Sequence, residues 1–237
     1  MHALVARAHQ QVADGAAIVD IGGESTRPGA TPVAIDVELA RAIPLVAALR
    51  GLAVPLSIDT RHAAVATAAL RAGASIVNDV SGLADAELPR AAAAFGAWLV
   101  VMHNGWARSD EGQGDVVQRV GDALAELVAD AVRAGVPADR VIVDPGLGFG
   151  KTVAESLTLV RRLGELRARF DRHVLLVGPS RKRFIGDTLG LGVADRLEGT
   201  LAIVALAVAA GADIVRVHDV GPALRVARIA LAVRAQA

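Results

Sequence analysis

Six polar residues of this chain follow short apolar segments, at positions where parallel β-strands would end. They are Asp59, Asn78, Asp144, Lys182, Arg216 and His218. Two carboxylates, an amide and an ammonium supply the donors and acceptors that suit a flat heterocycle with several ring nitrogens. Arg216 and His218 lie two residues apart, so on one strand they would point to the same side and could grip an anion together.

Each of these residues also has a plainer interpretation. Aspartates at strand ends often cap the following helix, and this alternative stays open for Asp59 and Asp144. The segment GLGFGK at 146–151 lacks the spacing of a Walker phosphate loop, so its glycines can simply form a tight turn. His103 ends an apolar run, which favours a buried, hydrogen-bonded core histidine over a catalytic one. Three more polar residues are expected to serve as cap or loop partners and receive no separate role: Glu24, His62 and Asp79.

The chain has 25 basic residues, and only Lys151 and Lys182 among them are lysines. Each closes a polar segment, GLGFGK and GPSRK respectively. A compact ammonium can be required where a planar guanidinium does not fit, although chance placement is the alternative. No pair of histidines or carboxylates shows zinc-ligand spacing, so we expect no tightly held structural metal ion.

The elements that position these residues alternate between strand and helix. Strands are predicted near Ala17–Gly22, Pro55–Asp59, Ser75–Asp79, Trp98–His103, Val141–Asp144, Val174–Gly178 and Ile214–His218. Helices are predicted over Ala3–Ala13, Val33–Arg50, His62–Ala72, Asp85–Phe95, Val116–Ala134, Val153–Arg169 and Leu197–Ala210. The glycines expected to cap five of these helices are Gly51, Gly73, Gly96, Gly135 and Gly211.

Alternating strands and helices leave an open doubly wound sheet or a closed α/β barrel. Polar residues follow all seven strands, which favours a TIM (β/α)8-type barrel, because an open sheet concentrates its site at one switch point. Only seven strands are evident, and the chain opens in a helix. We therefore expect the eighth strand to lie upstream of Met1. Either the start codon is assigned too late, or the chain is a truncated relative.

Composition predicts one domain over residues 1–237, with 53% hydrophobic residues to form its core. The 25 basic and 25 acidic residues leave no net charge, so neither nucleic acid nor an anionic membrane is an expected partner. No apolar run approaches the roughly 18 residues of a membrane span. The sequence lacks cysteine and a signal peptide, and we expect a cytoplasmic protein.

Six motifs in order give this chain a family resemblance. They read DIGGESTRPGA, SIDT, NDVSG, DPGLGFGKT, GPSRKRFIG and RVHDV. The chain resembles dihydropteroate synthase, of the pterin-binding barrel family. The resemblance implies condensation of 6-hydroxymethyl-7,8-dihydropterin diphosphate with 4-aminobenzoate, in a homodimer, with competition by sulfonamides at the aminobenzoate site.

The resemblance also implies roles for individual residues. The pterin pocket carries over to Asp59, Asn78, Asp144 and Lys182, with Asp59, Lys182 and Asp144 as catalytic residues. Asp59 would stabilise the cationic pterin that forms as diphosphate leaves. The diphosphate and aminobenzoate sites carry over to Thr26, Arg27, Pro28, Ser180, Arg216 and His218.

Three departures from the family pattern are visible. The family's first strand ends in a loop whose asparagine helps to bind Mg²⁺ and which closes over the site, and nothing here corresponds to it. The Mg²⁺ cofactor is thus implied without its usual asparagine ligand, which weighs against catalysis more than against pterin binding. Glu155 and Ser156 replace the usual His-Asn, which is expected to weaken packing or an ancillary contact. The segment Met102–Gly114 also differs, so His103 receives no catalytic role.

Two other functions remain open. A non-catalytic paralogue that binds pterin is favoured by the missing loop and opposed by the intact set of site residues. A pterin-dependent methyl-transfer module is opposed by GPSRKRFIG and by Arg216 and His218, because methyl transfer releases no diphosphate.

Overall fold

The computed structural model of the chain describes residues 1–25, 31–105 and 114–236. These form two compact units, which we describe separately. Unit 1 consists of Met1–Met102 and Leu127–Ile142, and unit 2 of His103–Glu126 and Val143–Ala237. No helix within the described ranges is long and apolar enough to cross a membrane.

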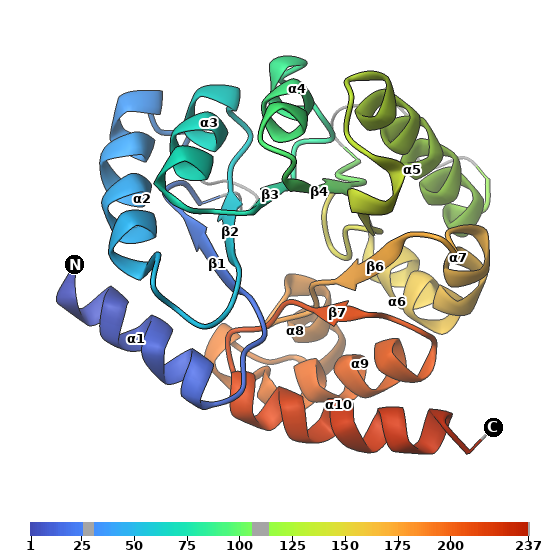
Figure 1. Cartoon of the computed structure of the whole chain (residues 1–237). Coiled ribbons are helices and arrows are strands. Elements are labelled where there is room, and N and C mark those ends of the chain that lie inside the picture. The colour runs from blue at the N-terminus through green and yellow to red at the C-terminus, as the bar shows by residue number, and fades with distance from the viewer. Residues whose placement is uncertain (26–30, 106–113, 237) are drawn as a thin grey trace. The chain divides into compact units, whose positions relative to one another are not determined.

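Unit 1 contains four parallel strands that pair in chain order. They are β1 (Val19–Gly22), β2 (Leu56–Asp59), β3 (Ile76–Asp79) and β4 (Trp98–Met102). The helices of this unit are α1 (His2–Ala13), α2 (Ile35–Leu49), α3 (Ala63–Ala72) and α4 (Glu87–Ala94). Figure 1 shows α2, α3 and α4 along one side of these strands. Every residue of β2 and β3 is buried, as expected for parallel strands covered on both faces.

The register of unit 1 aligns the polar ends of its strands. Gly22 of β1 pairs with Asp59 of β2, and Asp59 pairs with Asn78 of β3. Residues paired in a parallel sheet project to the same face, so the side chains of Asp59 and Asn78 share one face of the sheet.

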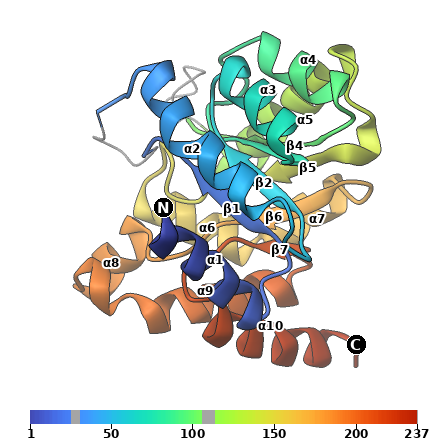
Figure 2. The same cartoon turned by 60° about the vertical axis from the view of Figure 1, so that its left-hand side comes forward.

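Unit 2 holds the end of β5 (Val141–Asp144), the parallel pair of β6 (Val174–Val177) and β7 (Ile214–Val215), and most of the remaining helices. The helices are α5 (Val116–Arg133), which the units divide, then α6 (Val153–Arg161), α7 (Leu163–Arg169), α8 (Arg183–Leu189), α9 (Leu197–Ala209) and α10 (Val220–Arg234). Two short 3-10 helices are η1 (Ala138–Arg140), in unit 1, and η2 (Val193–Asp195). Helices α9 and α10 pack side by side through Val204, Val208 and Ala230 (Figure 2).

The predicted strands are confirmed to within two residues at each end, except the last. The strand expected over Ile214–His218 ends at Val215, although the Arg216 N–H still donates to the Val177 carbonyl at 3.0 Å. The chain then leaves the extended conformation, because α10 begins at Val220.

Two helix predictions also differ from the structure. The helix expected over Val153–Arg169 is interrupted at Arg162, whose guanidinium binds Asp115 and Glu165. Helices α8 and α10 were not among those predicted. Of the five glycines expected as caps, four have positive φ and Gly51 does not, since Arg50 ends α2 in a right-handed conformation.

The first turn of α6 shows the effect of one departure from the family pattern. Thr152 Oγ1 accepts from the Glu155 N–H, and the Glu155 carboxylate accepts from the Thr152 N–H, which forms a capping box. Glu155 also pairs with Arg119 at 2.5 Å, and buried Ser156 donates to the Thr152 carbonyl. Glu155 and Ser156 thus both take part in hydrogen bonds at the start of α6, while weaker packing or a lost ancillary contact relative to the usual His-Asn stays a prediction.

Two glycines of unit 2 approach each other closely. A Cβ at Gly150 would lie 2.6 Å from the Asn104 carbonyl oxygen and 2.7 Å from the Gly105 Cα. Gly150 also has a φ of 55°, a region that side chains disfavour. The loop before α6 thus depends on glycine at position 150.

We predict that Gly150→Ala lowers the free energy of unfolding by at least about 1–2 kcal/mol, because it adds a backbone clash to a left-handed conformation. Gly164→Ala is the matched control, since a Cβ at this helical glycine meets nothing within 4 Å. It should leave stability unchanged or raise it by up to about 1 kcal/mol. Urea unfolding of both variants measures the difference, and equal effects would contradict the packing argument.

Candidate active site

In unit 1, the polar strand ends form a buried hydrogen-bonded group. Asp59 and Asn78 are 7% and 4% exposed. The Asn78 amide donates to Asp20 Oδ2 of β1 at 3.3 Å. Asp59 does not form the side-chain cap of α3, because the N-cap residue there is His62. The group therefore offers carboxylate acceptors next to an amide that is already oriented.

In unit 2, Asp144 and Lys182 form the electrostatic centre. Asp144 ends β5, is 6% exposed, and accepts the Gly146 N–H at 2.7 Å. It does not cap α6, whose N-cap is Thr152. Lys182 is the N-cap residue of α8, and its ammonium donates to the Leu147 carbonyl and lies 4.3 Å from the centre of the Phe149 ring. The loop between β5 and α6 thus contacts both Asp144 and Lys182.

Burial shifts both of these groups towards their neutral forms. It lowers the pKa of Lys182 to about 8, with the Asp144 carboxylate acting in the opposite direction and Arg216 acting in the same direction. Burial likewise raises the pKa of Asp144, although Lys182, the Gly146 N–H, Lys151 and Arg216 all act to lower it. Shifted groups of this kind concentrate at functional sites.

The second lysine holds the loop that follows Asp144. Lys151 Nζ donates to the carbonyls of His103, Gly146 and Phe149 at 3.1, 2.9 and 3.0 Å. Three diverging donors on one small cation match three backbone acceptors, which a planar guanidinium cannot do. The prediction that a lysine is required at this position is supported by this geometry.

The side chains of the tripeptide Ser180–Arg181–Lys182 contact different partners. Ser180 Oγ lies 2.7 Å from His218 Nδ1 and accepts the His218 N–H at 3.0 Å. Arg181 has a φ of 53°. Its guanidinium forms a bidentate ion pair with the Asp219 carboxylate, with hydrogen bonds of 2.9 and 3.1 Å. Arg181 is thereby held by its own contacts, while Ser180 orients His218.

Arg216 and His218 are both exposed and follow β7. We expected Arg216 and His218 to lie on one strand and to bind an anion together. The strand does not reach His218, which is positioned by Ser180 and not by strand pairing. Arg216 remains close enough for its charge to act on Lys182 and Asp144.

Other predicted residues have definite outcomes. Thr26, Arg27 and Pro28 lie outside the described residues. His103 is 7% exposed, as predicted for a core histidine. The minor roles given to Glu24 and Asp79 are confirmed, since Glu24 pairs with Arg61 and Asp79 accepts bonds from Ser81 and Leu83.

Sequence reasoning missed Asp20, Arg181 and Asp219. Asp20 lies two residues before Gly22, so the alternation of a strand could have placed it on the site face. No local pattern signals the pairing of Arg181 with Asp219, because the two residues are far apart in the sequence and meet only through folding.

Comparison with known proteins gives three consistent findings. A family model described as "Pterin binding enzyme" matches residues 1–218. The chain is 44% identical over 224 residues to the dihydropteroate synthase of Bacillus subtilis, covering 94% of the chain and 77% of that protein. It is also 41% identical over 230 residues to the inactive dihydropteroate synthase 2 of Mycobacterium tuberculosis (strain ATCC 25618 / H37Rv), covering 92% of the chain and 71% of that protein.

Longer relatives and solved structures agree with these findings. The chain is 46% identical over 234 residues to a probable bifunctional folylpolyglutamate synthase/dihydropteroate synthase of Haloferax volcanii, but spans only 28% of that protein. The Xanthomonas albilineans dihydropteroate synthase structure with 4-aminobenzoic acid matches at a TM-score of 0.93 and 38% identity, covering 99% of this chain and 85% of that one. The predicted α/β fold of the TIM-barrel type is confirmed by this likeness.

We predict that Lys182 titrates with a pKa of about 8. Because the chain has only two lysines, ¹³C-labelled lysine gives two ε-carbon NMR signals, and Lys182→Arg assigns them. Asp144→Asn should lower the pKa of Lys182, since it removes a negative charge that favours the ammonium. Arg216→Gln should raise it, since it removes a repelling cation. A Lys182 pKa near the usual 10.5 would contradict the argument.

Proposed function

The chain belongs to the dihydropteroate synthase family of pterin-binding enzymes, and on that premise we propose that it synthesises 7,8-dihydropteroate. The substrates would be 6-hydroxymethyl-7,8-dihydropterin diphosphate and 4-aminobenzoate, and the second product diphosphate. The observation that supports this most is that the buried Asp144 and the half-buried Lys182 act on each other's charge and both have shifted pKa values.

Asp144 and Lys182 offer complementary groups to a pterin. A buried carboxylate can accept from the amino and ring N–H groups of the heterocycle, and the lysine ammonium can donate to a ring acceptor. The Gly146 N–H donates to Asp144, and Lys151 holds the loop that contains Gly146. Both keep Asp144 in place without a substrate. We assign pterin contacts to Asp59 and Asn78 as well, following the family motifs.

The proposed diphosphate residues are Thr26, Arg27, Arg216 and His218, and the proposed aminobenzoate residues are Thr26, Arg27, Pro28 and Ser180. Arg216 is exposed and cationic, which suits a departing anion. His218 is oriented by Ser180, so a proton on its other ring nitrogen would point in a fixed direction.

The reaction needs no covalent intermediate with the protein. The bond between the pterin methylene carbon and the diphosphate oxygen breaks, and its electron pair leaves with diphosphate. The arylamine nitrogen then attacks the resulting cation, and the new C–N bond forms as the nitrogen releases a proton. The proposed role of Asp59 is to stabilise the cation by its negative charge, which is effective because the carboxylate is buried.

The resemblance also implies Mg²⁺, which prefers oxygen ligands. The described residues proposed for diphosphate, Arg216 and His218, offer a cation and an imidazole, and the Ser180 hydroxyl is bonded to His218. These side chains do not fit a magnesium site on the protein. No step of the proposed reaction therefore involves Mg²⁺.

A second candidate function is pterin binding without turnover. The specific observation in its favour is the 41% identity to the inactive Mycobacterium tuberculosis relative, which is close to the 44% found for the Bacillus subtilis enzyme. Asp59, Asn78, Asp144 and Lys182 all remain in this chain, which supports catalysis over loss of function.

Self-association belongs to the same proposal, with one domain per chain and a cytoplasmic location. Helix α10 exposes two large apolar residues one turn apart, Ile229 at 69% and Val233 at 66%. Neighbouring exposed apolar side chains of this kind suit a contact between identical subunits.

We predict that the purified chain forms dihydropteroate when supplied with pterin diphosphate, 4-aminobenzoate and Mg²⁺. Asp144→Asn should abolish turnover and weaken pterin binding by at least about 30-fold, because it removes a buried charged acceptor. The exposed Asp139→Asn is the control and should behave as wild type. Calorimetry with free pterin separates the candidates: binding without turnover in the wild type supports the non-catalytic function, and wild-type binding by Asp144→Asn contradicts the site.

We predict that Arg216→Ala weakens binding of pterin diphosphate by about tenfold or more while sparing free pterin, because the guanidinium would contact the anion and acts on Lys182 and Asp144 through its charge alone. Calorimetric affinities for the two ligands give the answer. Arg225→Ala, on α10, is the control for a lost positive charge. Equal losses for both ligands would show that Arg216 acts on the fold of the site instead.

A further inference from the structure

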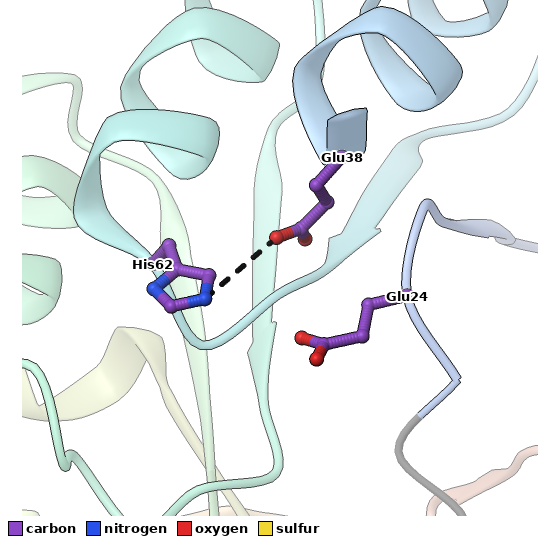
Figure 3. A group of neighbouring side chains, drawn as sticks. All are labelled: Glu24, Glu38 and His62. Atoms are coloured by element: carbon purple, nitrogen blue, oxygen red, sulfur yellow. Dashed lines mark ion pairs between the residues drawn. The ribbon is translucent and has the colours of Figure 1, made fainter. Parts of the chain in front are cut away.

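Three side chains that the proposed reaction does not use converge in unit 1. Glu24 follows β1, Glu38 lies in the first turn of α2, and His62 is the N-cap residue of α3. Figure 3 shows their polar ends facing one another. One ligand atom from each residue can be chosen so that all lie within 4.8 Å of one another.

The carboxylate of Glu38 lacks the partners that burial demands. Glu38 is 0% exposed, and neither of its oxygens accepts a hydrogen bond from any residue that the structure describes. Its nearest ionic neighbour, His62 Nε2, lies 4.0 Å from Oε2, which is too long for a hydrogen bond. His62 Nε2 is itself buried without a hydrogen bond in the described part of the chain. A buried charge in this state costs several kcal/mol unless something compensates it.

Glu24 is held as a charged carboxylate beside them. Arg61 donates to both of its oxygens at 3.1 Å, and the Val33 N–H donates at 3.3 Å. Burial raises the pKa of Glu24, but the hydrogen bonds and charge of Arg61 outweigh burial and hold that pKa below its usual range. Each carboxylate oxygen has two lone pairs, so Glu24 retains the capacity to bind a further group.

Gly23 brings the two carboxylates together. A Cβ at this position would lie 2.8 Å from the Glu38 backbone oxygen and 2.9 Å from Glu38 Cγ. Only glycine allows the segment after β1 to lie against the start of α2. The arrangement of Glu24 and Glu38 is thus fixed by backbone packing before any ligand binds.

We propose that Glu24, Glu38 and His62 bind a divalent metal ion of mixed nitrogen and oxygen preference, with Zn²⁺ as the best match. Imidazole nitrogen and carboxylate oxygen are both ligands that Zn²⁺ accepts, whereas Mg²⁺ is bound by oxygen ligands. This inference does not depend on the function proposed above.

Geometry and charge both agree with a metal ion. Zinc ligands lie about 2.0–2.2 Å from the metal, so two ligands of a tetrahedral site are about 3.4 Å apart. His62 Nε2 and Glu38 Oε2 are 4.0 Å apart, and all three ligand atoms lie within 4.8 Å of one another, so side-chain rotations would draw them in around the ion. Two carboxylates and the Arg61 guanidinium leave one net negative charge beside the His62 imidazole, and a cation offsets this charge.

The expected consequence is a cross-link between three segments. The metal ion would join the segment after β1 to the start of α2 and to the loop before α3. Because it binds the folded chain and not the unfolded one, it should raise the midpoint of thermal unfolding.

The test is titration of the chelator-treated full chain with ZnCl₂ in a calorimeter, with CoCl₂ as a spectroscopic probe. One zinc ion should bind per chain, and Glu38→Gln or His62→Asn should weaken it by about 100-fold or more, because each removes a ligand. His62→Asn keeps a good N-cap residue, which protects the fold. His9→Gln, at an exposed histidine of α1, is the control and should bind as wild type.

Two results would overturn the proposal. Equal zinc affinity in wild type, Glu38→Gln and His62→Asn would place the ion elsewhere. If zinc neither binds the wild type nor raises its unfolding midpoint, the three residues hold no metal ion. The second result needs no variant, so it holds even if a substitution prevents folding.

Discussion

The three hydrogen bonds of the Lys151 ammonium, which together clamp one loop, are the interaction on which Asp144 and Lys182 in unit 2 depend. This ammonium binds the carbonyls of His103, Gly146 and Phe149 at once, and this fixes the loop between β5 and α6. The same loop supplies the N–H that orients Asp144 and the carbonyl that receives Lys182. Without the clamp, these backbone groups would be free to turn towards water. The charge of the site is therefore organised by backbone atoms that one cation holds in place.

The two lysines are used for opposite physical reasons in a chain that otherwise relies on arginine. Lys151 is surrounded by acceptors, which satisfy its charge. Lys182 has fewer partners and is destabilised as a cation by burial and by Arg216. An arginine would keep its proton under both conditions. Only an ammonium allows one position to serve as a fixed charge and the other to have a pKa close to neutral pH.

The sequence was most informative where chemistry is local. Asp59, Asn78, Asp144 and Lys182 could be located from strand ends and motifs, since parallel strands place polar residues at one edge. The last strand was drawn too long because the apolar alternation around Val215 and Val217 continues beyond the paired residues, whereas the turn into α10 depends on Ser180. The group of Glu24, Glu38 and His62 could not be anticipated. It exists only because Gly23 lets two segments approach, and ligand spacing along the chain contains no sign of it.

Arg181 has a left-handed conformation, and its side chain makes contacts of a different kind from those of Ser180 and Lys182. Ser180 and Lys182 face groups of the candidate site, while Arg181 faces Asp219 and the carbonyls of Val193 and Ala194. In a mutational scan, substitutions at positions 180, 181 and 182 would all reduce function. Compensating mutations that stabilise the chain elsewhere could restore a variant at 181 but not one at 182. A conserved tripeptide in related sequences would then record two separate selective pressures, one on folding and one on ligand chemistry.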